Sequence, residues 1–369
     1  MMGDIRRIAV WPSGGRECAS CRFGVERRRG KAAACGQPQS FGQTGSRIDP
    51  LTASGHNVRL AGENYVVIEQ WMNSPSISQP DHLHAEIPAC PFTSSEHFDL
   101  ETQNMHGNLA LQRQRCAERM LRLYKEANAG HIGSSLSCLE ILVDLCFGRM
   151  APEDILVLSK GHAAGALYTT LSLSGRMPEA GLESFYQDGT VLAAHPSCSG
   201  AIRAIPFGTG SLGHGLGLAC GLAFSQRFTG HRFKVFAVLS DGDCNEGSTW
   251  EAALFAAHHR LANLTVILDL NGIQGFGLAK EVLNLEPVAD KWRAFGFSVS
   301  VADDGNSFSS LAQAYEQGGD DVSPRCIMAR TVKGNGVSYM RNQVDWHYLP
   351  MTDAQFEQAL AETRAAIRA

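Results

Sequence analysis

Two apolar runs that lead into oxygen-bearing side chains constrain the fold of this chain most strongly. Residues 235–239 (VFAVL) lead through Ser240 into Asp241 and Gly242, and residues 264–268 (LTVIL) are followed closely by Asn271. Short apolar runs bounded by turn residues are typical of buried strands. In an open α/β sheet, ligands bind just beyond the carboxyl ends of the strands. We therefore expect Asp241 and Asn271 to lie together at one edge of a sheet.

These two side chains have the chemistry of a magnesium site. A carboxylate, an amide oxygen and nearby backbone carbonyls are hard ligands that suit Mg²⁺, which completes its shell with phosphate oxygens and water. The pair therefore predicts a metal-bridged diphosphate. Asp and Asn are also common in the turns that follow strands, and that structural interpretation stays open on the spacing alone.

The sequence from residue 109 onward alternates between helical and strand patterns. Helices are predicted at residues 109–127, 139–147 and 212–228, and further strands at 155–158, 297–301 and 326–329. The helix at 212–228 carries Gly213, Gly217 and Gly221, which would let its backbone approach a neighbour closely. Strands that alternate with helices predict an α/β fold, with a parallel sheet and helices on both faces.

Composition narrows the class of protein. The 369 residues carry a net charge of −5 with 44% hydrophobic and 19% charged residues, which are globular values. The second half has no long basic block, so nucleic acid is not expected as a partner. No apolar run approaches the roughly 20 residues that span a bilayer, and no secretory signal is evident. Eleven irregularly spaced cysteines indicate reduced thiols in a cytoplasmic protein.

Residues 1–104 differ from the rest in composition and in their lack of a regular hydrophobic period. They are rich in Gly, Ser, Arg, Pro and Cys without a sustained period, which predicts a poorly structured extension before a domain at 105–369. Cys18 and Cys21 form a CxxC, but no matched second pair follows, so incidental cysteines are favoured over a zinc site. A non-native extension ahead of Met105 is a further interpretation.

Residues 208–213 (GTGSLG) fit the G-x-G-x-x-G pattern of dinucleotide sites. That fingerprint needs a preceding strand and an acidic residue about twenty positions later. Phe233 stands at the acidic position, so we favour a loop whose backbone amides approach a different cofactor.

Several histidines stand among small residues on predicted loops. These are His131, His162, His195 and His347. A lone histidine is more often structural, but several that meet at one sheet edge could bind sugar hydroxyls and move protons. Glu246, near the start of the helix after Asp241, could simply favour the helix dipole. Lys160 follows a strand and could contact solvent or an anion, and we assign it no chemical role.

The motifs together resemble the transketolase family. The similarity lies in residues 130–137 (GHIGSSLS), 158–163 (LSKGHA) and 210–215 (GSLGHG), and in the stretch from Ser240 to Asn271. The match extends from about residue 109 to the C-terminus. It is most similar to the N-terminal, thiamin diphosphate-binding subunit of split transketolases.

The resemblance implies a role for each matching residue. Asp241, Asn271 and the backbone carbonyl of Ile273 would hold Mg²⁺ on the diphosphate of thiamin diphosphate. The residues implied in cofactor binding are His162, Gly210, Ser211, Leu212, Asp241, Gly242 and Asn271. Those implied in catalysis are His131, His195 and His347, around the substrate carbonyl and hydroxyls, and Glu246 at the subunit interface.

The resemblance also implies partners. Family members need a pyrimidine-binding domain for which this chain has no room, so we expect a C-terminal transketolase subunit, together with a second copy of the heterodimer. The implied reaction transfers a two-carbon ketol unit from a ketose or its phosphate to an aldose or its phosphate. Ser240 departs from the usual glycine, Leu270 from a residue that is often polar, and His214 from the glutamine of many full-length relatives.

Two alternatives stay open. One keeps the fold but acts as part of a 2-oxo acid dehydrogenase-like or deoxyxylulose phosphate synthase-like enzyme. The other is a catalytically silent binding module. The histidines favour a sugar donor over the first, and the intact Asp241, Asn271 and Glu246 argue against the second.

Overall fold

The computed structural model describes residues 57–60, 63–66, 108–197 and 202–365. The chain divides into two units, residues 1–89 and 90–369. In the first unit, β1 (Asn57–Leu60) pairs with β2 (Glu63–Val66) as an antiparallel hairpin. The rest of the expected extension, including Met105 and the CxxC of Cys18 and Cys21, lies outside the described residues.

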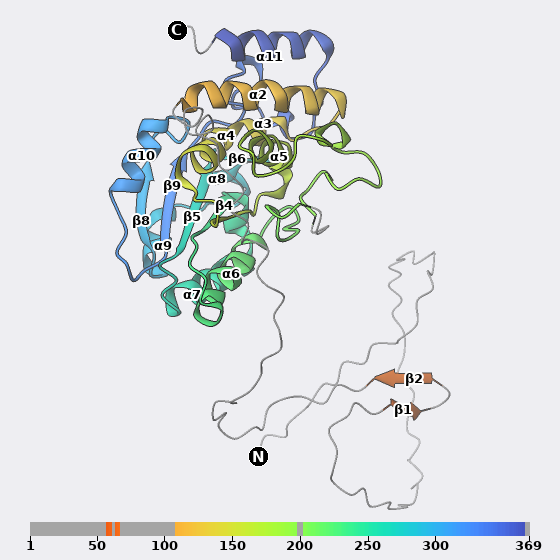
Figure 1. Cartoon of the computed structure of the whole chain (residues 1–369). Coiled ribbons are helices and arrows are strands. Elements are labelled where there is room, and N and C mark those ends of the chain that lie inside the picture. The colour runs from red at the N-terminus through yellow and green to blue at the C-terminus, as the bar shows by residue number, and fades with distance from the viewer. Residues whose placement is uncertain (1–56, 61–62, 67–107, 198–201, 366–369) are drawn as a thin grey trace, which may run out of the picture. The chain divides into compact units, whose positions relative to one another are not determined.

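Five parallel strands form the central sheet of the second unit, as predicted (Figure 1). Their spatial order is β3 (Ile155–Leu158), β4 (Val235–Ser240), β5 (Leu264–Leu270), β9 (Arg325–Arg330) and β8 (Ser298–Ala302). Every neighbouring pair runs parallel. Ser240 pairs with Asp269 in the register of β4 and β5, so these two strands end side by side.

Helices cover both faces of this sheet, because alternate side chains of each strand point to opposite sides. On one face lie α3 (Ile132–Ser137), α4 (Leu139–Asp144), α5 (Ala164–Leu173) and α10 (Phe308–Glu316). On this side α2 (Leu109–Glu126) packs over α4 and α5, and α11 (Asp353–Ala365) packs on α2. The other face packs against α6 (Gly215–Thr229), α7 (Gly247–His258) and α9 (Val288–Ala294). Along β4, Phe236 and Val238 enter the first core, whereas Val235, Ala237 and Leu239 enter the second.

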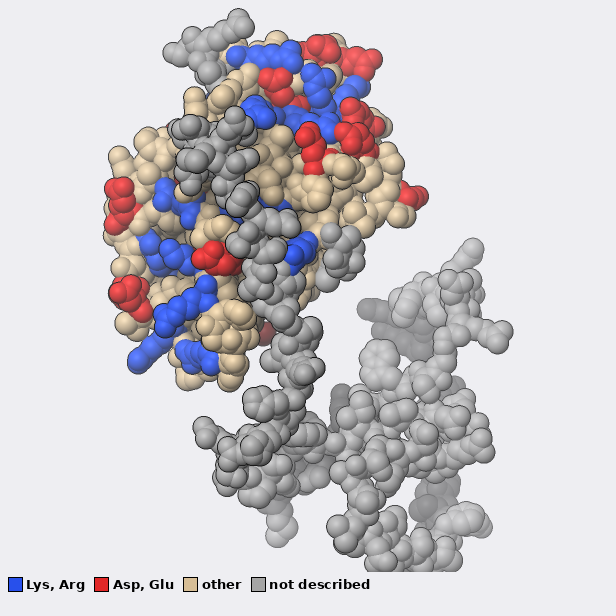
Figure 2. All heavy atoms as spheres, in the orientation of Figure 1, with Lys and Arg blue, Asp and Glu red and all other residues tan. Residues whose placement is uncertain are grey.

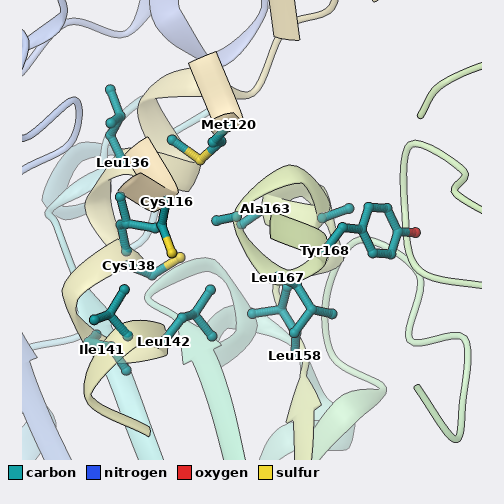
Figure 3. Packing of buried hydrophobic residues seen from close by; sticks show 14 of the residues in the cluster. Cys116, Met120, Leu136, Cys138, Ile141, Leu142, Leu158, Ala163, Leu167 and Tyr168 are labelled. Atoms are coloured by element: carbon teal, nitrogen blue, oxygen red, sulfur yellow. The ribbon is translucent and has the colours of Figure 1, made fainter. Parts of the chain in front are cut away.

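The first core is the larger of the two. In Figure 3, side chains of α2, α3, α4 and α5 point toward one another beside Leu158 at the end of β3. Cys116 and Cys138 are buried here, and all six cysteines of the described residues are free, buried thiols. The other five cysteines of the chain lie outside the described residues.

The outermost helix is held to α2 partly by charge. Arg364 of α11 pairs with Glu118 at 2.8 Å, and Lys125 pairs with Asp353 at 2.6 Å. Charged side chains of both signs gather over these two helices in Figure 2. Exposed pairs of this kind typically contribute at most about 1 kcal/mol each, so buried apolar contacts carry most of the stability of this layer.

Short elements complete the unit. They are the π-helical turn η1 (Leu145–Arg149), the 3₁₀ turns η2 (Gly161–Ala163), η3 (Leu182–Ser184), η4 (Gly242–Asn245), η5 (Ser338–Met340) and η6 (Asp345–His347), the hairpin of β6 (Ile273–Gln274) and β7 (Gly277–Leu278), and α8 (Ala279–Val282). No helix within the described residues is long and apolar enough to cross a membrane.

The order in which successive strands are added to the sheet reverses after β5, because β8 takes the outer position and β9 returns to lie between β5 and β8. The connections β4 to β5 and β5 to β8 use α7 and α9 on one face, whereas the return from β8 to β9 uses α10 on the other. Open α/β sheets bind ligands outside the carboxyl ends of the strands at such a switch point. We therefore expect a ligand to bind at the residues that follow β4, β5 and β9.

Candidate functional site

Asp241 and Asn271 converge on the same short segment at this edge. Oδ2 of Asp241 accepts a hydrogen bond from the backbone N–H of Gly272 at 3.0 Å. Oδ1 of Asn271 accepts one from the N–H of Ile273, also at 3.0 Å. The loops after β4 and β5 thus present a carboxylate, an amide oxygen and the Ile273 backbone in one place.

The carboxylate of Asp241 is suited to hold a cation. The residue is 4% exposed, and each carboxylate oxygen accepts one backbone N–H, Oδ1 from Gly242 at 2.8 Å. A carboxylate has about four lone-pair directions, so acceptor capacity remains. Burial and the nearby Asp269 carboxylate raise the pKa of Asp241 to about 6. A divalent ion would relieve this unfavourable buried charge, and the oxygen donors fit Mg²⁺.

Asp243, which the sequence reasoning missed, joins three segments around Asp241. One carboxylate oxygen accepts from Ser159 Oγ at 2.6 Å and from the N–H of Gly213 at 2.7 Å. The other accepts from the N–H and the hydroxyl of Ser240, at 2.8 and 2.9 Å. Ser240, which departs from the family's glycine, therefore has a structural role: its hydroxyl binds the carboxylate that organises the turn.

Gly161 allows the predicted cofactor loops to approach closely, and Gly242 lies beside the same loop. A Cβ atom on Gly161 would lie 2.0 Å from the carbonyl oxygen of Gly210, so only glycine fits there. Gly242 faces the methyl groups of Leu212, at 3.4 Å from its ideal Cβ position. The structure thus brings residues 210–212 beside both the end of β3 and the turn after β4.

The four predicted histidines meet in one cluster. The ring centroid of His131 lies 5.7 Å from that of His162, 5.8 Å from that of His195 and 5.1 Å from that of His347. His131 adopts a left-handed φ of 70° and donates its N–H to the carbonyl of His347 at 3.0 Å. A non-glycine residue in this conformation is strained and is held by its surroundings.

Neighbouring groups set the tautomers of two of these rings. Nδ1 of His162 lies 3.4 Å from the carbonyl oxygen of Ser211, which can only accept, so Nδ1 carries the proton and Nε2 is an acceptor. Nδ1 of His347 lies 3.0 Å from Nζ of Lys333. A protonated lysine can only donate, so His347 exposes a protonated Nε2. These two rings therefore offer one acceptor nitrogen, Nε2 of His162, and one donor nitrogen, Nε2 of His347.

All four imidazoles favour the neutral form. Burial, with the nearby His195 and Lys333, lowers the pKa of His131 to about 4. Burial and the Lys333 ammonium lower the pKa of His347 to about 3. Burial also lowers the pKa of His162 and of His195. Each neutral imidazole can accept a hydrogen bond at one ring nitrogen and donate one from the other.

Two buried lysines belong to the site, although sequence reasoning assigned a chemical role to neither. Lys160 is fully buried and pairs with Asp269, so the expectation that it could contact solvent is wrong. Nζ of Lys333 lies 3.3 Å from the carbonyl oxygen of Ile273. Burial and the nearby Lys160 ammonium lower the pKa of Lys333 to about 8. Their positions after β3 and β9 were the only signal in the sequence.

Glu246 lies apart from the histidines. It is exposed at the N-terminus of α7, and its Cβ and Cγ atoms pack over Gly213. His214, which precedes α6, is also exposed. Both residues are available to another molecule, and neither lines the cavity that lies beside Asp241.

A cavity of about 390 Å³ beside Asp241 lies between residues of β5, β8 and β9 and the segment 278–289, and none of the four clustered histidines lines it. Its lining includes Leu270, Met328 and two basic residues, Lys280 and Arg330. This volume lies within the range of small-molecule sites. Among the described residues, no group of three or more His, Cys, Asp or Glu side chains is arranged to hold a metal ion, so the histidine cluster is not a zinc-type centre.

Comparison with known proteins agrees with this geometry. Residues 118–364 match the family model described as transketolase, thiamine diphosphate binding domain. The chain belongs to the transketolase family. This match confirms the family and the fold expected from the sequence.

Two relatives that align with this chain over almost their whole length are named as transketolase subunits. The chain is 34% identical over 269 residues to an apulose-4-phosphate transketolase subunit of Phocaeicola vulgatus, covering 70% of this chain and 95% of that one. It is 36% identical over 264 residues to a 6-deoxy-6-sulfo-D-fructose transketolase subunit of a Clostridium species, covering 68% and 95%.

The fold also matches a solved transketolase. The enzyme from Campylobacter jejuni superposes with a TM-score of 0.61 at 27% identity, covering 72% of this chain and 43% of that one. This chain therefore spans less than half the length of the solved enzyme.

Proposed function

We propose that this chain is the thiamin diphosphate-binding subunit of a two-chain transketolase, which moves a two-carbon ketol unit from a ketose to an aldose. The observation that carries the proposal is the convergence of Asp241 and Asn271 beside four clustered histidines. When bound, thiamin diphosphate supplies the electron sink for cleaving the bond next to a ketose carbonyl, and the protein supplies binding and orientation.

Asp241, Asn271 and the Ile273 carbonyl would hold Mg²⁺ against the diphosphate. The Ile273 carbonyl accepts from the Lys333 ammonium, which indicates that this oxygen is oriented to bind a cation. Gly210, Ser211, Leu212 and Gly242 would line the diphosphate through their backbone, since Gly161 leaves no side chain between β3 and this loop. His162, whose Nδ1 lies 3.4 Å from the Ser211 carbonyl oxygen, would contact it beside this loop.

His131, His195 and His347 would bind and orient the sugar. Their neutral imidazoles can hold hydroxyl groups and accept or return a proton at the substrate carbonyl. General acid–base help of this kind is typically worth about 10²–10⁴-fold in rate. The cluster supports a polyhydroxylated donor over a 2-oxo acid, which has no hydroxyls to bind. The names of the two relatives support a sugar with a terminal phosphate or another terminal anion.

The exposed face of α6 and α7 supports association with other chains. Gly217 and Gly221 have open space above them, so the close approach expected at these glycines is not made within the described residues. Phe228 and Leu254 are 76% and 58% exposed on the same two helices. We assign this surface and the nearby Glu246 to contacts with a second heterodimer, and the pyrimidine-binding site to a partner subunit. Cytoplasmic location is part of the same proposal.

Calorimetry tests the proposal. Thiamin diphosphate with Mg²⁺ is titrated into the full chain, first alone and then with a candidate partner subunit. A separate activity assay compares ketose cleavage with 2-oxo acid decarboxylation. We expect binding that Asp241→Ala abolishes and that Asp188→Ala, a change at an exposed residue, leaves intact. Negligible binding in both conditions contradicts the proposal, and decarboxylation without ketol transfer contradicts the sugar substrate.

A further inference from the structure

The side-chain amide of Asn271 is held at both of its ends. Oδ1 accepts from the N–H of Ile273, and Nδ2 donates to the Oγ atom of Ser137, each at 3.0 Å. Ser137 lies at the end of α3, far from Asn271 in the sequence. Because an amide can rotate to exchange its oxygen and nitrogen, these contacts decide which atom faces the edge of the sheet.

The direction of the contact with Ser137 is fixed by a third residue. The Ser137 hydroxyl donates to the carboxylate oxygens of Asp269, at 2.6 and 2.8 Å. A hydroxyl has a single hydrogen, so this donation leaves only lone pairs for Asn271. Ser137 can then accept from the NH₂ group of Asn271 and cannot donate to its oxygen.

A buried cation donates to Asp269. Lys160 donates to Asp269 and to the carbonyl of Ser134, and the hydroxyl of Thr331 donates to Asp269 as well. Lys160, Asp269 and Ser137 are completely buried. An ammonium group has no acceptor atom, so Asp269 accepts from Lys160. The same carboxylate accepts from the Ser137 hydroxyl, which leaves that hydroxyl to accept from Asn271.

The backbone of Ser137 is fixed separately. Nδ2 of Asn306 donates to the Ser137 carbonyl at 3.0 Å, and Oδ1 of Asn306 accepts from the N–H of Val332 at 2.8 Å. The end of α3 is therefore attached to the loop that follows β9. The backbone of Ser137 cannot shift away from Asn271 without breaking these bonds, and the Asp269 contacts hold its hydroxyl.

We propose that Ser137, Asp269 and Lys160 form a positioning unit that holds the Asn271 amide with its oxygen available to a divalent cation. The inference rests on the metal site of the proposed function and adds residues to it that do not touch the ion. Outer residues that orient metal ligands typically contribute about 10–100-fold to metal affinity.

Mn²⁺ binding in the presence of thiamin diphosphate, followed by electron paramagnetic resonance on the full chain, tests this unit. Carboxylate and carbonyl ligands accept Mn²⁺ as well as Mg²⁺. Ser137→Ala should weaken Mn²⁺ binding by about 10–100-fold. The matched control is Ser135→Ala in the same helix, because the Ser135 hydroxyl bonds to Tyr124 and not to this unit. It should leave Mn²⁺ affinity within about threefold of the unmodified chain, below the range of a positioning residue.

The outcomes separate the two claims. If the unmodified chain binds no Mn²⁺ with thiamin diphosphate, the metal site itself fails, and the positioning unit with it. If the unmodified chain binds but Ser137→Ala binds equally well, only the positioning unit is overturned. Equal losses in both serine variants also overturn it, since they indicate a general loosening of α3. Ser137→Thr keeps the hydroxyl and should recover affinity relative to Ser137→Ala. Urea unfolding of each variant identifies any that fails to fold.

Discussion

The backbone N–H of Gly213 donates a 2.7 Å hydrogen bond to the buried carboxylate of Asp243. This contact ties the glycine-rich loop before α6 to the turn that carries Asp241. Because Ser159 and Ser240 donate to the same carboxylate, a single side chain sets the spacing of three segments at the edge of the sheet.

Asp243→Asn should disturb this arrangement. One carboxylate oxygen faces the N–H of Gly213 and the other faces the N–H of Ser240, so an amide must place its NH₂ group against one of these donors. We expect the free energy of unfolding to fall by about 2 kcal/mol, the scale of a hydrogen bond to a charged group. Urea denaturation measures this change. The exposed control Asp188→Asn should stay within about 0.5 kcal/mol, and an equally small effect at Asp243 would refute its structural role.

A pair of glycine substitutions should have opposite effects on stability. Gly161→Ala places a methyl group 2.0 Å from the Gly210 carbonyl oxygen, which must separate the two loops and lower both stability and cofactor affinity. Gly221→Ala adds a methyl group to an exposed position of α6 with open space around it. It should stabilise the isolated chain by about 0.5–1 kcal/mol.

Thermal unfolding and sedimentation together check this pair. If α6 contacts another copy, Gly221→Ala should raise the melting temperature of the isolated chain yet weaken its association. Unchanged association would count against the assignment of this helix to an interface. A stable Gly161→Ala variant with normal cofactor affinity would show that the loops adapt.

The histidine cluster should resist protonation. His131 and His347 have pKa values lowered to about 4 and about 3, against about 6.5 in an unfolded chain. The unfolded state therefore binds more protons between pH 6.5 and pH 4, so these groups favour folding above pH 6.5 and oppose it as the pH falls toward 4.

Proton NMR of the imidazole Cε1–H should show neither ring titrating above pH 5. The same chain in urea serves as the control, with midpoints near 6.5. A midpoint near 6.5 for His131 in the folded protein would contradict the account.

The sequence was sufficient for the parts of the site that lie next to regular elements. Asp241 and Asn271 could be predicted because each closely follows an apolar run, and the parallel register of β4 and β5 follows from the alternation of strands and helices. The four histidines could be named as a group, although their meeting depends on loops of irregular conformation, such as the left-handed residue at His131.

The polar contacts beneath the site could not be predicted in the same way. Ser137 and Asp269 are brought together only by the packing of α3 against the sheet, and Lys333 reaches His347 through a loop with no periodic pattern. Asp269 follows the apolar run 264–268 within β5, and nothing in the local pattern assigned it a partner. Buried polar pairs of this kind depend on three-dimensional packing, which local periodicity does not report.

A crystal structure of the full chain with Mn²⁺ and thiamin diphosphate tests the central claim most directly, because anomalous scattering locates the ion independently of the protein atoms. We predict one peak within about 2–2.5 Å of a carboxylate oxygen of Asp241, Oδ1 of Asn271 and the carbonyl oxygen of Ile273. A peak bound elsewhere, or Asp241 and Asn271 oxygens too far apart to share one ion, would contradict it.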